Sequence, residues 1–113
     1  MHSSMTDSDY HARAEALLRS LEVQMDDWLQ CDVIDIDTQR SGGLLELSFP
    51  DGSKIVVNKQ PPLQEIWLAS RAGGFHFGWN GTAWCDTKSG ESFDAVFATQ
   101  ASRQAGKPLT LSS

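Results

Sequence analysis

Two spacings of apolar residues follow one another along this chain, and their order restricts the folds that it can adopt. Over residues 10–28, apolar side chains recur every three or four positions, which predicts an amphipathic α-helix. Over residues 33–86, apolar and polar residues alternate in short runs, which predicts β-strands. Helical spacing returns over residues 93–101 and stops before Gly106 and Pro108. The predicted order is one helix, about six strands and a second helix.

Short turn motifs separate the predicted strands, which cover residues 33–37, 44–49, 54–58, 66–69, 75–77 and 83–86. The motifs SGG, PDGS, RAGG and NG are typical of tight turns. Strands joined by such turns are antiparallel neighbours, so both helices can cover only one face of the sheet. The sequence therefore predicts an α+β fold. It is a two-layer αβ sandwich with two helices packed on one face of an antiparallel sheet of about six strands.

The length of 113 residues predicts one domain. We expect residues 1–8 to be disordered. The first four, MHSS, are interpreted as a remnant of expression or of an upstream start, because Met5 is a second plausible start. Ser8 or Asp7 is the expected cap of the first helix. Residues 9–113 are expected to form the single domain.

Acidic charge is concentrated near the N-terminus. Residues 1–40 contain nine carboxylates and three arginines, whereas residues 41–113 contain six acids and six bases, so the formal net charge of −6 belongs to the first part. The densest stretch, DDWLQCDVIDID at residues 26–37, has five aspartates and no Lys or Arg. Crowded like charges oppose the compact state and point to a cationic partner, either a metal ion or a basic protein surface. The same charge argues against nucleic acid, whose phosphates need basic patches.

The cysteines and the apolar runs bear on where the protein works. Cys31 and Cys85 lie far apart and form no CxxC motif, which suits a reducing cytosol. No apolar run approaches the length of a membrane span, and the N-terminus has neither a signal-peptide core nor an Arg-rich transit segment. We therefore expect a cytoplasmic protein without a membrane partner.

The most distinctive stretch is NKQPPLQEIWLAS at residues 58–70. With the acidic helix before it and GGFHF at residues 73–77 after it, this stretch resembles the frataxin family, and the bacterial homologues look nearest. The resemblance runs from about Asp9 to Pro108. It implies a non-enzymatic, iron-binding protein that regulates iron–sulfur cluster assembly or supplies iron to it. It also implies docking on the cysteine desulfurase and on the scaffold protein of that pathway.

The resemblance implies a set of iron ligands, which we call the acidic ridge. Adding the neighbouring Asp32, its residues are Glu22, Asp26, Asp27, Asp32, Asp35 and Asp37. His11 and Glu15 are additional candidate ligands at the other end of the helix. Positions where homologues often carry further acids are here Val23, Leu29, Cys31 and Val33, so we expect the ridge to hold fewer ions. The implied partner-binding residues are Glu22, Asp26, Asp27, Asn58, Gln60 and Trp67.

The ligand chemistry of exposed carboxylates predicts weak, hydrated sites. Oxygen donors suit Fe²⁺ and Fe³⁺ and discriminate poorly against Mn²⁺, Mg²⁺ or Ca²⁺, so other divalent cations are expected to substitute. The expected state is a monomer that can oligomerise with iron. Two alternatives stay open: a ferroxidase that stores iron, and a metal-independent protein-binding adaptor. The acidic residues also fit a solvated face that keeps the protein soluble.

Strand alternation makes a specific prediction for Trp67. Ile66 and Leu68 point to one face of the sheet, and Trp67 points to the other. The two aliphatic side chains suit the face under the helices, so Trp67 is expected on the open face as an interface anchor. His76, between Phe75 and Phe77, is expected on the open face too. In the alternative, a bulge inverts the register and buries Trp67.

Overall fold

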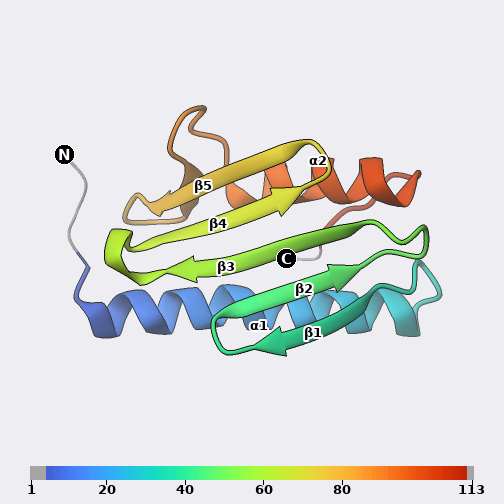
Figure 1. The fold of residues 1–113 in the computed structure, drawn as a ribbon, viewed down its shortest axis with the longest axis horizontal. Helices are drawn as coiled ribbons and strands as arrows, with labels where there is room; N and C mark the ends of the chain where they lie inside the picture. Colours follow the sequence, from blue (N-terminus) through green and yellow to red (C-terminus); the bar gives the residue numbers. More distant parts are fainter. Residues whose placement is uncertain (1–4, 112–113) are drawn as a thin grey trace.

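Within the residues that the structure describes, six strands form a single antiparallel sheet in the order β1-β2-β3-β4-β5-β6, with two helices on one face. The computed structural model describes residues 5–111. Figure 1 shows the sheet in front of both helices, with α1 behind β1 and β2 and α2 behind the other half of the sheet. The predicted two-layer αβ sandwich is confirmed. The elements are α1 (Asp7–Gln30), β1 (Asp37–Ser41), β2 (Leu44–Ser48), β3 (Lys54–Gln60), the 3₁₀ turn η1 (Pro61–Leu63), β4 (Glu65–Ser70), β5 (Gly73–Trp79), β6 (Trp84–Asp86) and α2 (Phe93–Ala105).

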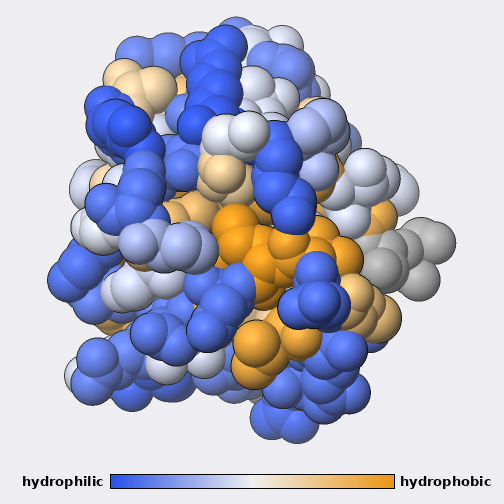
Figure 2. Space-filling view, turned by 90° about the vertical axis from the view of Figure 1, so that its right-hand side faces the viewer, coloured by the Kyte–Doolittle hydropathy of each residue, from blue (hydrophilic) through white to orange (hydrophobic). Residues whose placement is uncertain are grey.

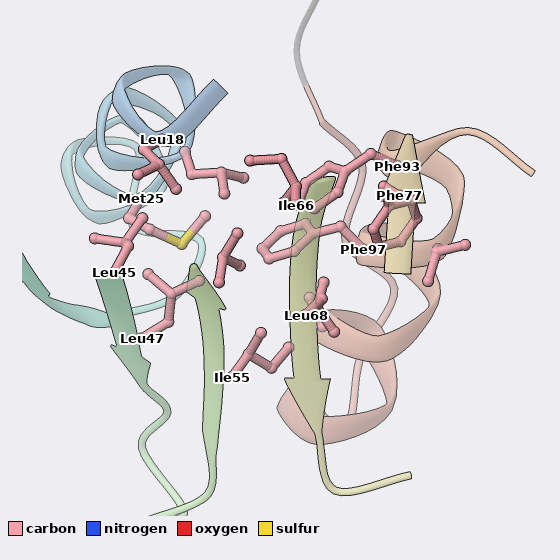
Figure 3. Packing of buried hydrophobic residues seen from close by; sticks show 14 of the residues in the cluster. Leu18, Met25, Leu45, Leu47, Ile55, Ile66, Leu68, Phe77, Phe93 and Phe97 are labelled. Atoms are coloured by element: carbon pink, nitrogen blue, oxygen red, sulfur yellow. The ribbon is translucent and has the colours of Figure 1, made fainter. Parts of the chain in front are cut away.

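The core lies between the helices and one face of the sheet. Every second residue of the central strands points into it, as the alternation predicted, and both helices add their apolar stripes (Figure 3). The residues labelled in that view, all nearly fully buried, are Leu18, Met25, Leu45, Leu47, Ile55, Ile66, Leu68, Phe77, Phe93 and Phe97. The opposite face of the sheet is not covered by either helix.

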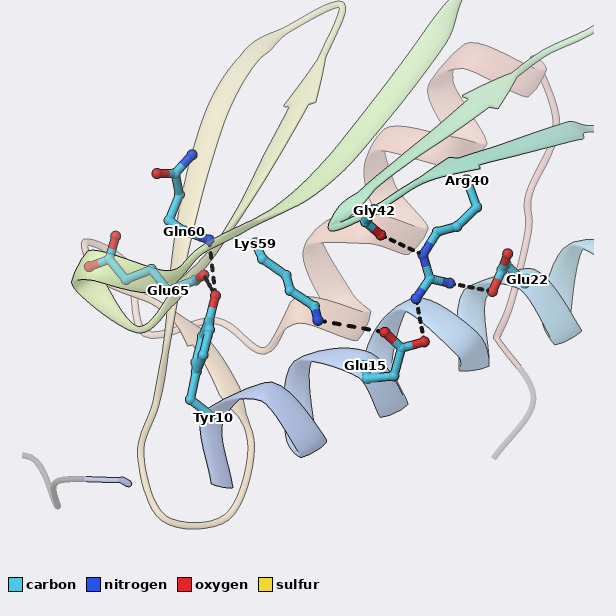
Figure 4. A network of polar contacts seen from close by, with 8 residues as sticks. All are labelled: Tyr10, Glu15, Glu22, Arg40, Gly42, Lys59, Gln60 and Glu65. Atoms are coloured by element: carbon cyan, nitrogen blue, oxygen red, sulfur yellow. Dashed lines mark hydrogen bonds and ion pairs between the residues drawn. The ribbon is translucent and has the colours of Figure 1, made fainter. Parts of the chain in front are cut away.

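Tyr10 fixes the start of α1 against the sheet. Its hydroxyl donates a hydrogen bond to the carbonyl oxygen of Glu65 at 2.7 Å and accepts one from the backbone N–H of Gln60 at 2.9 Å. These two residues flank η1, so one side chain ties the helix to both β3 and β4 (Figure 4). Burial raises the pKa of the Tyr10 hydroxyl, which keeps it protonated as the donor that this contact needs.

The first helix begins earlier than expected. α1 starts at Asp7, and its N-cap is Thr6, whose side chain accepts a hydrogen bond from the backbone N–H of Asp9 at 3.0 Å. The predicted caps, Ser8 and Asp7, instead lie within the first turn. Residues 7 and 8 therefore lie within α1, whereas the predicted domain begins at residue 9. The expectation for residues 1–4 lies outside the described residues.

The first strand begins four residues later than predicted, at Asp37 instead of Val33. The end of α1 explains the difference. Asp32 adopts a left-handed conformation (φ 60°), its N–H donates to the Leu29 carbonyl at 3.1 Å, and the Val33 N–H donates to the Trp28 carbonyl at 2.8 Å. These contacts form a Schellman motif, which uses backbone groups that a strand would need for pairing. The alternating pattern after Cys31 therefore belongs to a helix-terminating loop.

The loop that follows α1 is anchored by apolar side chains. Val33 and Ile34 are half-buried against the core, and Leu109 and Leu111 of the C-terminal segment pack on the same core. Figure 2 views this end of the molecule and shows a hydrophobic area surrounded by hydrophilic side chains.

Neither helix within residues 5–111 is long and apolar enough to cross a lipid bilayer.

Candidate functional site

The aspartates of the acidic ridge lie at the C-terminal end of α1 and in the loop that leads to β1. All five are exposed to solvent, and Asp37 is the first residue of β1. Asp35 precedes the strand, although the predicted first strand, residues 33–37, included it. The ridge aspartates are Asp26, Asp27, Asp32, Asp35 and Asp37.

Glu22, the sixth member of the ridge, is not a free carboxylate. The guanidinium of Arg40, on β1, donates to Glu22 Oε1 at 2.7 Å and also to Glu15, and its Nε donates to the Gly42 carbonyl at 3.2 Å. Lys59 Nζ lies 3.6 Å from Glu15 Oε1 (Figure 4). Glu15 and Glu22 therefore pair with bases on β1 and β3 and are not part of a freely solvated acidic face. The hydrogen bond from Arg40 is the largest cause holding the pKa of Glu15 below its ordinary value.

Arg40→Gln should reverse this neutralisation. We expect the pKa of Glu15 to rise toward its ordinary value of 4.5. A carboxylate with a depressed pKa contributes stability above its unfolded-state pKa, and this contribution disappears as the pH falls through the folded-state pKa. The stability difference between the native protein and the variant should therefore shrink below about pH 4.5. NMR titration of the Glu15 side chain checks the first expectation, and thermal melts across pH check the second. Identical Glu15 titration curves in both proteins would contradict the assignment.

The position of the ridge opposes the stability of α1. Asp26 and Asp27 lie within the last five residues of the helix, where negative charge interacts unfavourably with the helix dipole, and the last turn has no basic residue. Asp32 occupies the left-handed position after the helix, where Gly is usual. Three acids thus stand at a helix end that favours positive charge. Stability of the fold does not account for them.

The described residues hold no group of three or more His, Cys, Asp or Glu side chains placed to bind one metal ion together. Asp26 accepts a hydrogen bond from Gln30 Nε2 at 2.9 Å, and Asp27 Oδ1 lies 4.0 Å from Cys31 Sγ. His11 is separated from Asp26 by fifteen helical positions, or about 22 Å, so α1 does not bring it to the ridge. The ridge offers separate carboxylate oxygens, which can bind hydrated hard cations singly or in pairs.

A second candidate surface crosses the open face of the sheet. Asn58 of β3 pairs with Trp67 of β4, which pairs in turn with His76 of β5, and Leu44 of β2 pairs with Asn58. Cross-strand partners lie on the same face, so these four side chains form one transverse row. Gln60, the other predicted partner-binding residue, follows Asn58 on the same face. Three predicted partner-binding residues are thus neighbours.

Trp67 is held in place on this face. Its ring stacks on His76 with 4.0 Å between centroids and 5° between planes, and its Nε1–H donates to Glu65 Oε1 at 2.8 Å. The registers of β3, β4 and β5 are continuous through Trp67, so no bulge inverts it, and its position on the open face is confirmed. Sequence reasoning missed the roles of His76 and Glu65. The hairpin turn at residues 71–72 could have supplied the register that pairs His76 with Trp67.

Comparisons with known proteins find similarity over most of the chain. The model of the frataxin-like domain matches residues 3–107. The chain is 51% identical over 105 residues to the iron-sulfur cluster assembly protein CyaY of Variovorax paradoxus. The match covers 93% of this chain and 96% of that protein. The chain belongs to the frataxin family. The frataxin structure from Psychromonas ingrahamii superposes with a TM-score of 0.85 at 28% identity and covers 96% of this chain and 100% of its own. Trimeric frataxin of Saccharomyces cerevisiae, complexed with ferrous iron, superposes with a TM-score of 0.65 at 26% identity. The superposition covers 95% of this chain and 92% of the yeast chain.

In this frataxin-family chain the two candidate surfaces meet at β1. Asp37 pairs with Ser48, and the next residue, Thr38, pairs with the buried Leu47. Thr38 therefore faces the helices, and Asp37 faces the open side of the sheet. The ridge ends where the open face begins, so one partner can contact both surfaces.

Proposed function

We propose that this protein binds iron and acts in iron–sulfur cluster assembly by docking on the cysteine desulfurase and scaffold complex. The observation that carries the proposal is the cluster of exposed aspartates at the C-terminal end of α1. These charges oppose the helix dipole and, within residues 5–111, pair with no arginine like the one that neutralises Glu22. A basic partner surface or a metal ion supplies the missing positive charge.

The open face supports docking independently of charge. Trp67 is a large aromatic side chain on a surface that no helix covers, and His76 and Glu65 fix its orientation. Preoriented aromatic side chains are typical anchors of protein interfaces because little entropy is lost when they bind. Asn58 and Gln60 supply polar groups beside it.

Iron is the cargo of the ridge and not a resident cofactor. Carboxylate oxygens fit Fe²⁺, and the yeast relative was crystallised with ferrous iron. Within residues 5–111, the ridge carboxylates do not converge as a three-ligand centre. This arrangement favours reversible binding over a preorganised site for iron oxidation, and the CyaY relatives are named as assembly proteins.

Divalent cations should stabilise the protein beyond the effect of ionic strength. A site filled at 100 times its dissociation constant raises the free energy of unfolding by ~2.7 kcal/mol. We expect Fe²⁺ under anaerobic conditions, Mn²⁺ and Ca²⁺ each to raise the melting temperature relative to NaCl of matched ionic strength. The increase should be smaller in the isosteric variant Asp26→Asn, Asp27→Asn. Equal melting temperatures in divalent salt and in NaCl would contradict the proposed metal binding.

A further inference from the structure

Two aliphatic side chains stand exposed among the carboxylates of the acidic ridge. Among residues 5–111, the large hydrophobic side chains that are exposed to solvent are Val23, Leu29, Leu44 and Leu63. Val23 is 63% exposed and Leu29 is 51% exposed, and both lie in the C-terminal half of α1. Neither belongs to the hydrophobic core.

The helix places both side chains beside ridge aspartates. Residues three or four positions apart are neighbours on a helix surface. Val23 is therefore a neighbour of Asp26 and Asp27, and Leu29 is a neighbour of Asp26 from the other side. The Leu29 carbonyl also accepts from the Asp32 N–H at 3.1 Å, where the chain turns away from the helix. Each aliphatic side chain is thus next to exposed negative charge.

Neither the fold nor metal binding accounts for this arrangement. Valine has a lower helix propensity than glutamate, glutamine or lysine, and at 63% exposure Val23 gains little from burial. An aliphatic side chain also has no donor atom that could coordinate an ion. A protein surface can cover such side chains and pair with the carboxylates around them, which is the usual composition of an interface with an apolar centre and a polar rim.

The surrounding charge restricts what can cover Val23 and Leu29. Asp26, Asp27 and Asp32 are exposed, and none of them forms an ion pair with another residue of the described chain. A second copy of this chain would bring the same aspartates against them, which is unfavourable because like charges repel across an interface. The complementary surface is therefore basic and carries an apolar group.

We propose that Val23 and Leu29 are the apolar contact residues of the ridge, and that its partner presents an aliphatic side chain flanked by lysine or arginine. This inference rests on the proposed function, in which the basic partner is the cysteine desulfurase. The aspartates then steer the encounter, because charge complementarity mainly increases association rates and specificity. The two aliphatic side chains slow dissociation by removing apolar surface from water.

The test compares the affinities of the native protein and of Leu29→Gln for the desulfurase by calorimetric titration. Glutamine has a helix propensity close to that of leucine and changes no charge, so the melting temperature should stay the same. We expect binding to weaken about fivefold, the loss expected when half of a leucine side chain stays in water. The dependence of affinity on salt should stay as in the native protein. Val23→Gln should weaken binding as well.

Leu63→Gln is the matched control. Leu63 is 58% exposed, but it lies in η1, which adjoins the start of α1 and not the ridge. This variant should bind as the native protein does. Equal affinities of the native protein, Leu29→Gln and Leu63→Gln would overturn the inference and leave the proposed function standing, because the native protein binds. Equal losses in the two variants would overturn it too, because the effect would then not be local to the ridge.

Two further outcomes would also contradict the inference. If sedimentation shows a dimer of the native protein that Leu29→Gln dissociates, the surface binds a second copy of the chain. If the native protein does not bind the desulfurase at all, the proposed function fails and this inference fails with it.

Discussion

The double variant Asp26→Lys, Asp27→Lys should lose its affinity for the cysteine desulfurase by about a hundredfold or more, because like charges facing each other across an interface cost several kcal/mol. Both side chains are exposed, and the Gln30 and Cys31 contacts that they lose are local. Lysine near a helix C-terminus interacts favourably with the dipole. We therefore expect the melting temperature to stay equal or rise while binding is lost. Calorimetric titration and thermal melts measure the two effects.

A control with the same change in net charge is Glu91→Lys, Asp94→Lys. Both residues are exposed and lie at or just before the N-terminus of α2, away from the ridge. This variant should retain most of its affinity, and lysine at a helix N-terminus should lower its stability slightly. Equal losses of binding in the two variants would show that net charge acts without a local docking site. Binding that persists in the ridge variant would exclude the ridge as the contact.

Trp67→Ala should weaken binding to the desulfurase or scaffold by about tenfold or more, as expected for a central aromatic anchor. The cost in folding stability should stay near ~1–2 kcal/mol, because Trp67 is half-buried on the open face and its main contacts are the His76 stack and the Glu65 hydrogen bond. A core tryptophan would cost ~3–5 kcal/mol. Denaturant unfolding and binding titrations measure the two quantities on the same sample.

Trp84 provides the matched comparison for this prediction. It is 6% exposed and packs in the core beside Tyr10 and Trp79. Trp84→Ala should therefore lower the free energy of unfolding by the ~3–5 kcal/mol expected for a core tryptophan, a larger loss than that of Trp67→Ala. If the two variants are equally destabilised, the assignment of Trp67 to an uncovered face is wrong. If Trp67→Ala is stable and binds normally, the anchor lies elsewhere on the sheet.

The fold and the face of each central strand were predictable because they follow from residue spacing. Alternation placed Ile66 and Leu68 in the core and Trp67 outside it, and Gly106 ended α2 where expected. These are local patterns in which side-chain direction is set by the backbone. The start of the first strand was predicted wrongly because alternation cannot distinguish a strand from an extended loop held by a Schellman motif at Asp32.

The electrostatics of the site were less predictable, because they depend on contacts between distant residues. Arg40 lies eighteen positions after Glu22 in sequence, yet donates to it across the interface between β1 and α1. Counting charge within residues 26–37 could not reveal that the neighbouring glutamates are neutralised by β1 and β3. The stack of Trp67 on His76 likewise depends on strand register, which follows from the two-residue turn at residues 71–72 and not from the alternation of apolar residues.

The most direct test of docking through the acidic ridge is the affinity of the unmodified protein for the desulfurase and scaffold complex as a function of salt. Screening shortens from about 8 Å at physiological ionic strength to about 3 Å at 1 M. Charge-driven docking predicts binding at low salt that weakens steeply as salt increases, whether iron is present or removed by a chelator. The absence of binding at low salt, or an affinity that does not change with salt, would contradict docking through the acidic ridge.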